Sequence, residues 1–272
     1  MSAPVAIRWD EDDVPTGAVG LHVRRVIAPQ AAPILLLHGL GVTGSVWMPF
    51  ARRLAPGYAA IAPDLRGHGE SDEPPTGYTP GDYSRDLAGL CDALSIEAVP
   101  ALGHSLGALV ALAERRPDRV ATLVLVDPPV DATIPYADVQ AVYRLRHEPA
   151  GALEAYLLAA DLGGNAALAA ALARLFRQAA DAAFEAVLAT RPDQWDAWDH
   201  AHQVAQPTLV VQADPAHGGV LGAAAARAFV DRLPHGRLVT IPGAAHAIHA
   251  SHPAALATTV LDFLRGAARS PR

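Results

Sequence analysis

The chain contains little of what several protein classes require. Its 272 residues include one cysteine, Cys91, so an internal disulfide is excluded. That cysteine and the 12 histidines show no spacing typical of a zinc site, and we expect no metal or cofactor. The 21 Lys and Arg residues are outnumbered by 28 Asp and Glu residues, which gives a net charge of −7. A chain without a basic stripe cannot neutralise phosphates, so we expect no nucleic-acid partner.

Segments that would place the chain in or across a membrane are also missing. No apolar run reaches the length of about 18 residues that a spanning helix needs, and the alanine-rich stretch 166–173 is too short. Residues 1–13 are polar and acidic and have no apolar core of the kind found in a signal peptide. We therefore expect a cytoplasmic protein, a monomer or homodimer, that does not bind membranes.

Short apolar runs alternate with helical patterns along most of the chain. A composition of 51% hydrophobic residues suffices for a full core. The expected strands are residues 5–9 paired with 19–27, then 33–37, 58–62, 98–102, 122–126, 208–212 and 237–241. The expected helices between them are residues 46–54, 80–94, 108–116, 223–233 and 253–264. This alternation predicts an α/β fold with a mostly parallel sheet covered by helices on both faces.

One segment interrupts the alternation. From residue 130 to 205 the pattern is helical only, with expected helices at 137–146, 150–160, 165–179 and 181–189. A helical insertion between two strands of a sheet is typical of a cap over one sheet edge. We therefore predict a core made of residues 1–129 and 206–272, and a cap made of residues 130–205.

A serine stands at the centre of the sequence Gly103-His104-Ser105-Leu106-Gly107, which follows an expected strand and opens an expected helix. A serine on so sharp a turn adopts a strained backbone, and glycines on either side leave room for it. Its hydroxyl then projects from the strand end, beside the N–H of Leu106. This arrangement predicts a nucleophile, Ser105, with Leu106 as one donor of an oxyanion hole.

Two further loops at strand ends carry residues that a serine nucleophile would need. The run His38-Gly39-Leu40-Gly41 follows the strand at 33–37, and the N–H of Leu40 is the expected second oxyanion donor. The general base must be a histidine. His246 lies after the last strand and before the last helix, with His249 and His252 as rivals.

Four ordered segments together resemble the α/β-hydrolase superfamily. They are Leu35-Leu36-Leu37-His38-Gly39, Asp64-Leu65-Arg66-Gly67-His68-Gly69, the Ser105 turn, and Gly243-Ala244-Ala245-His246. The resemblance implies an eight-stranded, mostly parallel sheet, a Ser-Asp/Glu-His triad and a helical cap after the sixth strand. From the residues themselves, we interpret the stretch 64–71 as a structural loop beside the site.

The acid of the implied triad has two candidates. Members of the superfamily usually carry it after the seventh strand, where this chain has alanine at the expected position and Asp214 two residues early. A minority carry it after the sixth strand, where Asp127 stands here. We favour Asp127 and keep Asp214 as the alternative.

These residues predict a serine hydrolase that acts on a small to medium hydrophobic ester or lactone through an acyl-enzyme. Serine at position 105 argues against dehalogenase or epoxide-hydrolase chemistry, which needs aspartate there. A carbon–carbon bond hydrolase, a cofactor-free lyase and a receptor with vestigial activity stay open, because fold does not decide among them. The residues expected to line the substrate pocket are His38, Gly39, Trp47, Trp195 and Trp198.

Overall fold

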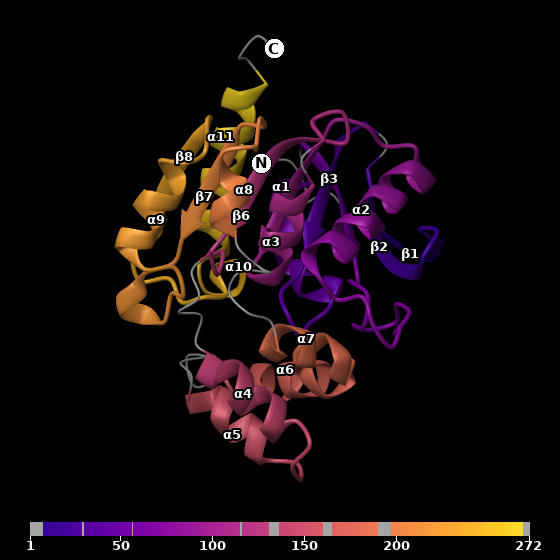
Figure 1. Cartoon of the computed structure of the whole chain (residues 1–272), viewed down its shortest axis with the longest axis vertical. Coiled ribbons are helices and arrows are strands. Elements are labelled where there is room, and N and C mark those ends of the chain that lie inside the picture. The colour runs from indigo at the N-terminus through magenta and orange to yellow at the C-terminus, as the bar shows by residue number, and fades with distance from the viewer. Residues whose placement is uncertain are drawn as a thin grey trace, which may run out of the picture.

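A computed structural model describes residues 8–28, 30–55, 57–114, 116–130, 136–159, 165–189 and 197–268. Its strands form one eight-stranded sheet in the order β1-β2-β4-β3-β5-β6-β7-β8 (Figure 1). The strands are β1 (Arg8–Pro15), β2 (Gly20–Ile27), β3 (Ala32–Leu37), β4 (Tyr58–Pro63), β5 (Val99–His104), β6 (Val120–Val126), β7 (Thr208–Gln212) and β8 (Gly236–Thr240). The pairs β1–β2 and β2–β4 are antiparallel and all other pairs are parallel, so the predicted fold class is confirmed.

The first strand extends beyond the range that the apolar pattern predicted. Residues 8 and 9 of the expected strand pair with β2 as predicted, and residues 5–7 lie outside the described residues. β1 then continues to Pro15 through an acidic stretch in which only Val14 is buried. It is an edge strand, held by its antiparallel ladder to β2 and by ion pairs such as Glu11 to Arg24 at 3.2 Å. An edge strand exposed on both faces has no hydrophobic alternation to reveal it.

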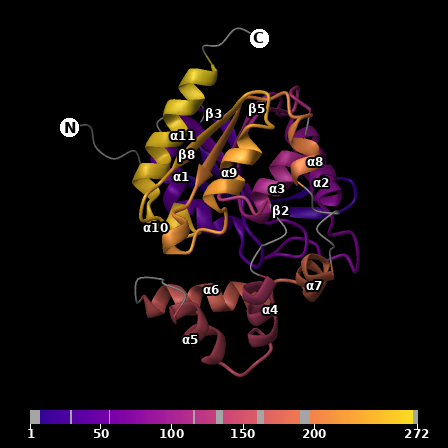
Figure 2. The same ribbon diagram turned by 60° about the vertical axis from the view of Figure 1, so that its left-hand side comes forward.

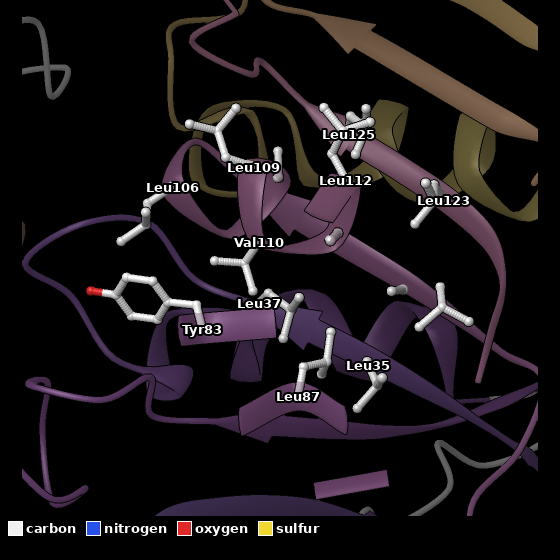
Figure 3. Close-up of a cluster of buried hydrophobic side chains, with 14 of the residues drawn as sticks. Leu35, Leu37, Tyr83, Leu87, Leu106, Leu109, Val110, Leu112, Leu123 and Leu125 are labelled. Carbon is white, nitrogen blue, oxygen red and sulfur yellow. The ribbon is translucent and has the colours of Figure 1, made fainter. Parts of the chain in front are cut away.

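The central strands are buried on both faces, which explains their unbroken apolar runs. Leu35 and Leu37 of β3 point into a first cluster, whereas Ile34 and Leu36 point into a second on the opposite face. The first cluster, part of which Figure 3 shows, packs under α2 (Pro80–Leu94), α3 (Leu106–Ala113) and α9 (Ala223–Val230). The second packs under η1 (Gly44–Trp47), α1 (Met48–Leu54), α10 (Ile248–Ser251) and α11 (Pro253–Ala267).

Helices α4 (Tyr136–Leu145), α5 (Ala152–Ala159), α6 (Ala166–Gln178) and α7 (Asp181–Ala189) form a separate layer beyond one end of the sheet (Figures 1 and 2). They enclose a third hydrophobic cluster that includes Leu153, Ala173 and Phe184. This helical insert is consistent with the expected cap. The chain then returns through α8 (Ala197–Ala201), whose two terminal alanines are buried in the first cluster.

The parallel strands bring the expected site residues to one edge of the sheet. Leu37 pairs with Gly103, and His104 pairs with Val126, so the loops after β3, β5 and β6 begin at neighbouring points. The ladders continue one step past the strand ends: the N–H of Ser105 donates to Val126 O at 3.1 Å, and the N–H of Asp127 donates to Val211 O at 2.7 Å. The site therefore rests on strand ends that the core holds rigid.

The described part of the chain contains no helix that combines the length and the apolar character of a membrane span.

Candidate active site

Ser105 sits on a strained turn between β5 and α3. Its φ of 52° and ψ of −117° lie in a region that residues with side chains rarely adopt. A Cβ on Gly103 would overlap the carbonyl of Gly107, and one on Gly107 would overlap the carbonyl of Leu37. The two glycines thus let α3 begin directly behind the serine, whose side chain remains partly exposed.

Asp127 and His246 form a direct pair. Nδ1 of His246 lies 2.7 Å from Oδ2 of Asp127, whose side chain is fully buried. The carboxylate also accepts from the N–H groups of Ala213 at 3.1 Å, Val220 at 2.9 Å and Leu221 at 3.4 Å. A carboxylate fixed by three backbone donors holds the imidazole in one orientation, with Nδ1 donating and Nε2 free to accept a proton.

Asp214 is engaged elsewhere. Its carboxylate accepts from the N–H groups of Gly243 at 2.9 Å and Ala216 at 3.0 Å, and it lies 3.0 Å from Nδ1 of His217. These backbone donors hold the pKa of Asp214 below its usual value. The Asp214 side chain therefore links the loop after β7 to the loop after β8. Of the two candidate acids, the structure brings Asp127 to His246.

The loop that carries His246 lies against the serine turn. Nε2 of His104 is 3.1 Å from the carbonyl oxygen of His246, and the two rings are 4.5 Å apart. Ser105 is the next residue after His104. The structure therefore brings together the serine turn, His246 and Asp127 from three strand ends that are far apart in sequence.

The rival histidines have other surroundings. The ring of His249 is buried between those of Trp47, at 4.5 Å, and His104, at 4.9 Å. Burial lowers the pKa of His249 to about 3 and that of His104 well below its usual value, so both rings stay neutral near pH 7. His252 stands between α10 and α11.

The loop after β3 approaches the serine from its other side. A Cβ on Gly39 would lie 3.4 Å from that of Ser105. The ring of His38 accepts from the N–H of Leu65 at 2.8 Å through Nε2, so its Nδ1 donates to the carbonyl of Gly39 at 2.7 Å. In a trans peptide the carbonyl and the following N–H point in opposite directions. The N–H of Leu40 therefore points away from the His38 ring.

The residues expected to line a pocket have different surroundings. Trp47 and His38 are fully buried, Trp47 in the second cluster and His38 behind the loop it supports, so neither faces a substrate. Trp47 turns inward because η1 directs it toward Phe50 and His249. Trp198 packs edge-on against Phe229, with the guanidinium of Arg232 over its ring. Gly39 does lie beside Ser105, and Trp195 is outside the described residues.

Sequence reasoning missed one backbone support of the site. It is the pair of N–H groups on Val220 and Leu221, which the chain presents to Asp127 directly after Gly218 and Gly219. Two adjacent glycines were the available signal. Asp64 belongs to the stretch interpreted as a structural loop. Its carboxylate is fully buried, accepts from the N–H of Gly44 at 2.8 Å and pairs with Arg24 at 2.6 Å. It ties the loop after β4 to the start of η1.

Comparison with known proteins identifies the family and the fold. Residues 34–259 match the family described as "Alpha/beta hydrolase family". The 2-(acetamidomethylene)succinate hydrolase of Mesorhizobium japonicum is 31% identical and aligns with 92% of this chain and 94% of its own. The enol-lactonase of Burkholderia xenovorans LB400 has the same fold, with a TM-score of 0.80, 24% identity and coverage of 94% of this chain and 100% of its own. An esterase from Exiguobacterium antarcticum aligns with a TM-score of 0.79 and 20% identity, over 94% of this chain and 98% of its own.

Proposed function

Because this chain belongs to the alpha/beta hydrolase family, we propose that it is a serine hydrolase of small to medium hydrophobic esters or lactones. Ser105 is the nucleophile, His246 the general base and Asp127 the acid that orients it. The N–H groups of Leu40 and Leu106 form the oxyanion hole. The observation that carries the proposal is the 2.7 Å contact between Nδ1 of His246 and the buried carboxylate of Asp127. The loop that carries His246 also packs against the Ser105 turn.

The reaction proceeds in two halves. Ser105 Oγ attacks the substrate carbonyl while Nε2 of His246 takes its proton, and the two N–H groups stabilise the oxyanion. The alkoxide then leaves with the proton from His246, and the acyl group stays on Ser105. A water molecule gives a proton to His246 and attacks the acyl carbonyl. Collapse of this second intermediate returns the proton to Ser105 and releases the acid.

The buried negative charge of Asp127 matters most when His246 carries its proton. The imidazolium then has a carboxylate at 2.7 Å on Nδ1, inside a site that excludes water from the acid. This stabilisation is larger in the transition state than in the resting enzyme, so it raises kcat rather than affinity.

The substrate class follows from the residues beside the loop after β3. Leu40 packs against both the first cluster and the cap cluster, and the nearest cap side chains are aromatic. An apolar acyl or alkyl group suits such surroundings. The relative from Mesorhizobium japonicum is named for a substituted succinate, so a dicarboxylate of that class belongs in the substrate panel.

The test is hydrolysis of p-nitrophenyl esters, model lactones and 2-(acetamidomethylene)succinate by wild type and Ser105→Ala. We expect turnover of at least one apolar ester or lactone, reduced by roughly 10³-fold or more in Ser105→Ala. Equal turnover by the two proteins would overturn the proposed function. Turnover of the dicarboxylate alone would support the proposed triad but contradict the proposed substrate class.

A further inference from the structure

The cap packs closely against the loop after β3 at Gly41. Gly41 has a φ of +77°, and a Cβ on it would overlap the ring of Phe176 and lie 2.9 Å from Cζ of Phe184. Gly39, two residues earlier, is the residue beside Ser105. Two aromatic rings from α6 and α7 are therefore pressed directly against the backbone of this loop, with no room for a methyl group between them.

Leu40, between these two glycines, is shared by the core and the cap. Its side chain packs against the first cluster beneath the sheet edge and against the cap cluster that contains Phe184. The carbonyl of Gly39, which precedes Leu40, accepts a hydrogen bond from Nδ1 of His38. The backbone after Leu40 is covered by the cap. The direction of the Leu40 N–H thus depends on contacts from both layers.

The cap is itself held firmly at this place. In α7, Ala183 is buried in the first cluster and Phe184 in the cap cluster, so one helix joins the two layers. The N–H of Ala180 donates to the carbonyl of Gly67 in the core at 2.7 Å. Arg146 fixes the same turn from within the cap: it pairs with Asp181 at 2.8 Å and lies 4.6 Å over the ring of Phe184.

We propose that Phe176 is a positioning residue for catalysis: by pressing on Gly41 it holds the Leu40 N–H in the geometry of the oxyanion hole. The inference rests on the proposed function. Phe176 acts without touching the reacting atoms, and the cap supplies part of the machinery in addition to any contact with substrate. Loss of one oxyanion donor costs roughly 10²–10³-fold in kcat, and partial misplacement costs a fraction of that.

This role makes a prediction that a substrate-lining role does not. A residue that only contacts the acyl chain affects long substrates more than short ones and changes KM. A residue that sets the oxyanion donor lowers kcat by the same factor for every substrate, because each one develops the same oxyanion.

The experiment compares Phe176→Ala and Phe176→Leu with wild type on p-nitrophenyl acetate and p-nitrophenyl octanoate. We expect Phe176→Ala to lower kcat about tenfold or more on both esters by the same factor, with KM changed less than about threefold. Phe176→Leu retains bulk against Gly41 and should recover most of the rate. Tyr156→Phe is the matched control in the same cap, since it removes a hydroxyl bonded to Asp138 at 2.7 Å, and its rate should equal wild type.

A second variant tests the contact from the other side. Gly41→Ala adds a methyl where the Phe176 ring now lies, so it should also lower kcat on both esters. In the Phe176→Ala background the added methyl meets less obstruction, and the further loss caused by Gly41→Ala should be smaller than in wild type. Additive losses would mean that the two residues do not act through this contact. Thermal melting of each variant separates this effect from unfolding.

The proposal is overturned if Phe176→Ala slows octanoate hydrolysis but not acetate hydrolysis, or leaves both rates unchanged. Ser105→Ala, measured alongside, distinguishes this failure from failure of the proposed function. If Ser105→Ala is inactive while Phe176→Ala behaves as wild type, the serine chemistry stands and the positioning role falls.

Discussion

Asp127 lies fully buried with its carboxylate 2.7 Å from Nδ1 of His246, although 119 residues separate the two in sequence. The contact exists because β6 and β7 are neighbours in the sheet, and the N–H groups of Ala213 and Val220 turn the carboxylate toward the last loop. Asp214, after β7, instead accepts from the N–H of Gly243 in that last loop.

The first prediction separates these two carboxylates. Asp127→Asn should lower kcat by roughly 10³–10⁴-fold, because an amide can present the wrong hydrogen-bonding group to His246. Asp214→Asn should leave kcat within about threefold of wild type and lower the melting temperature, because it weakens only the hydrogen bonds that link the loops after β7 and β8. Ester hydrolysis with melting curves for both variants is the measurement. The reverse pattern of rates would assign the acid to Asp214.

The second prediction concerns stability in acid. Burial lowers the pKa of His38 to about 4 and that of His68 and His249 to about 3. In the unfolded chain these groups titrate near 6.5, so below that pH the unfolded state binds more protons than the folded state. The stabilisation from neutral histidines is complete above pH 6.5 and is lost as the pH falls toward 4, by up to about 1.4 kcal/mol per pH unit for each ring.

His249→Phe tests this directly. The ring contacts with Trp47 and His104 can be kept, and Nδ1 of His249 has no hydrogen-bond partner to lose among the residues that the structure describes. The variant should show a shallower fall in the free energy of unfolding between pH 6.5 and 4, measured by urea unfolding at several pH values. An unchanged slope would show that His249 takes up its proton equally in the folded and unfolded states.

The third prediction concerns Cys91. The side chain is 1% exposed, and burial raises the pKa of its thiol to about 11, with the Glu114 carboxylate adding to the effect. A buried thiol is a poor nucleophile near pH 7. Iodoacetamide should therefore leave the native protein unlabelled and its hydrolase activity intact, with labelling appearing only in urea. Rapid inactivation of the native protein, prevented in Cys91→Ala, would contradict this account.

Some of this structure was predictable because the signals are local. The helix at residues 80–94 was expected with its observed bounds, and Thr79 and Asp82 form the capping box that starts it. The serine turn is equally local, since Gly103 and Gly107 are required by backbone contacts within one strand–helix unit and its neighbouring strand.

Other features depend on which segments meet in three dimensions. The sequence favoured Asp127 but left Asp214 open, because the choice depends on the loop at Val220. Trp47 was expected beside a substrate but is directed into the core by η1. The contact of Phe176 with Gly41 depends on how the cap docks, which no local pattern records.

The central claim is that Ser105 becomes acylated during turnover. Intact-protein mass spectrometry of wild type and Asp127→Asn, quenched in acid after mixing with a p-nitrophenyl ester, measures this directly. The account predicts a mass increase of one acyl group, located to the peptide that contains Ser105 and absent from Ser105→Ala. An acyl group on another residue, or full turnover by Ser105→Ala, would contradict it.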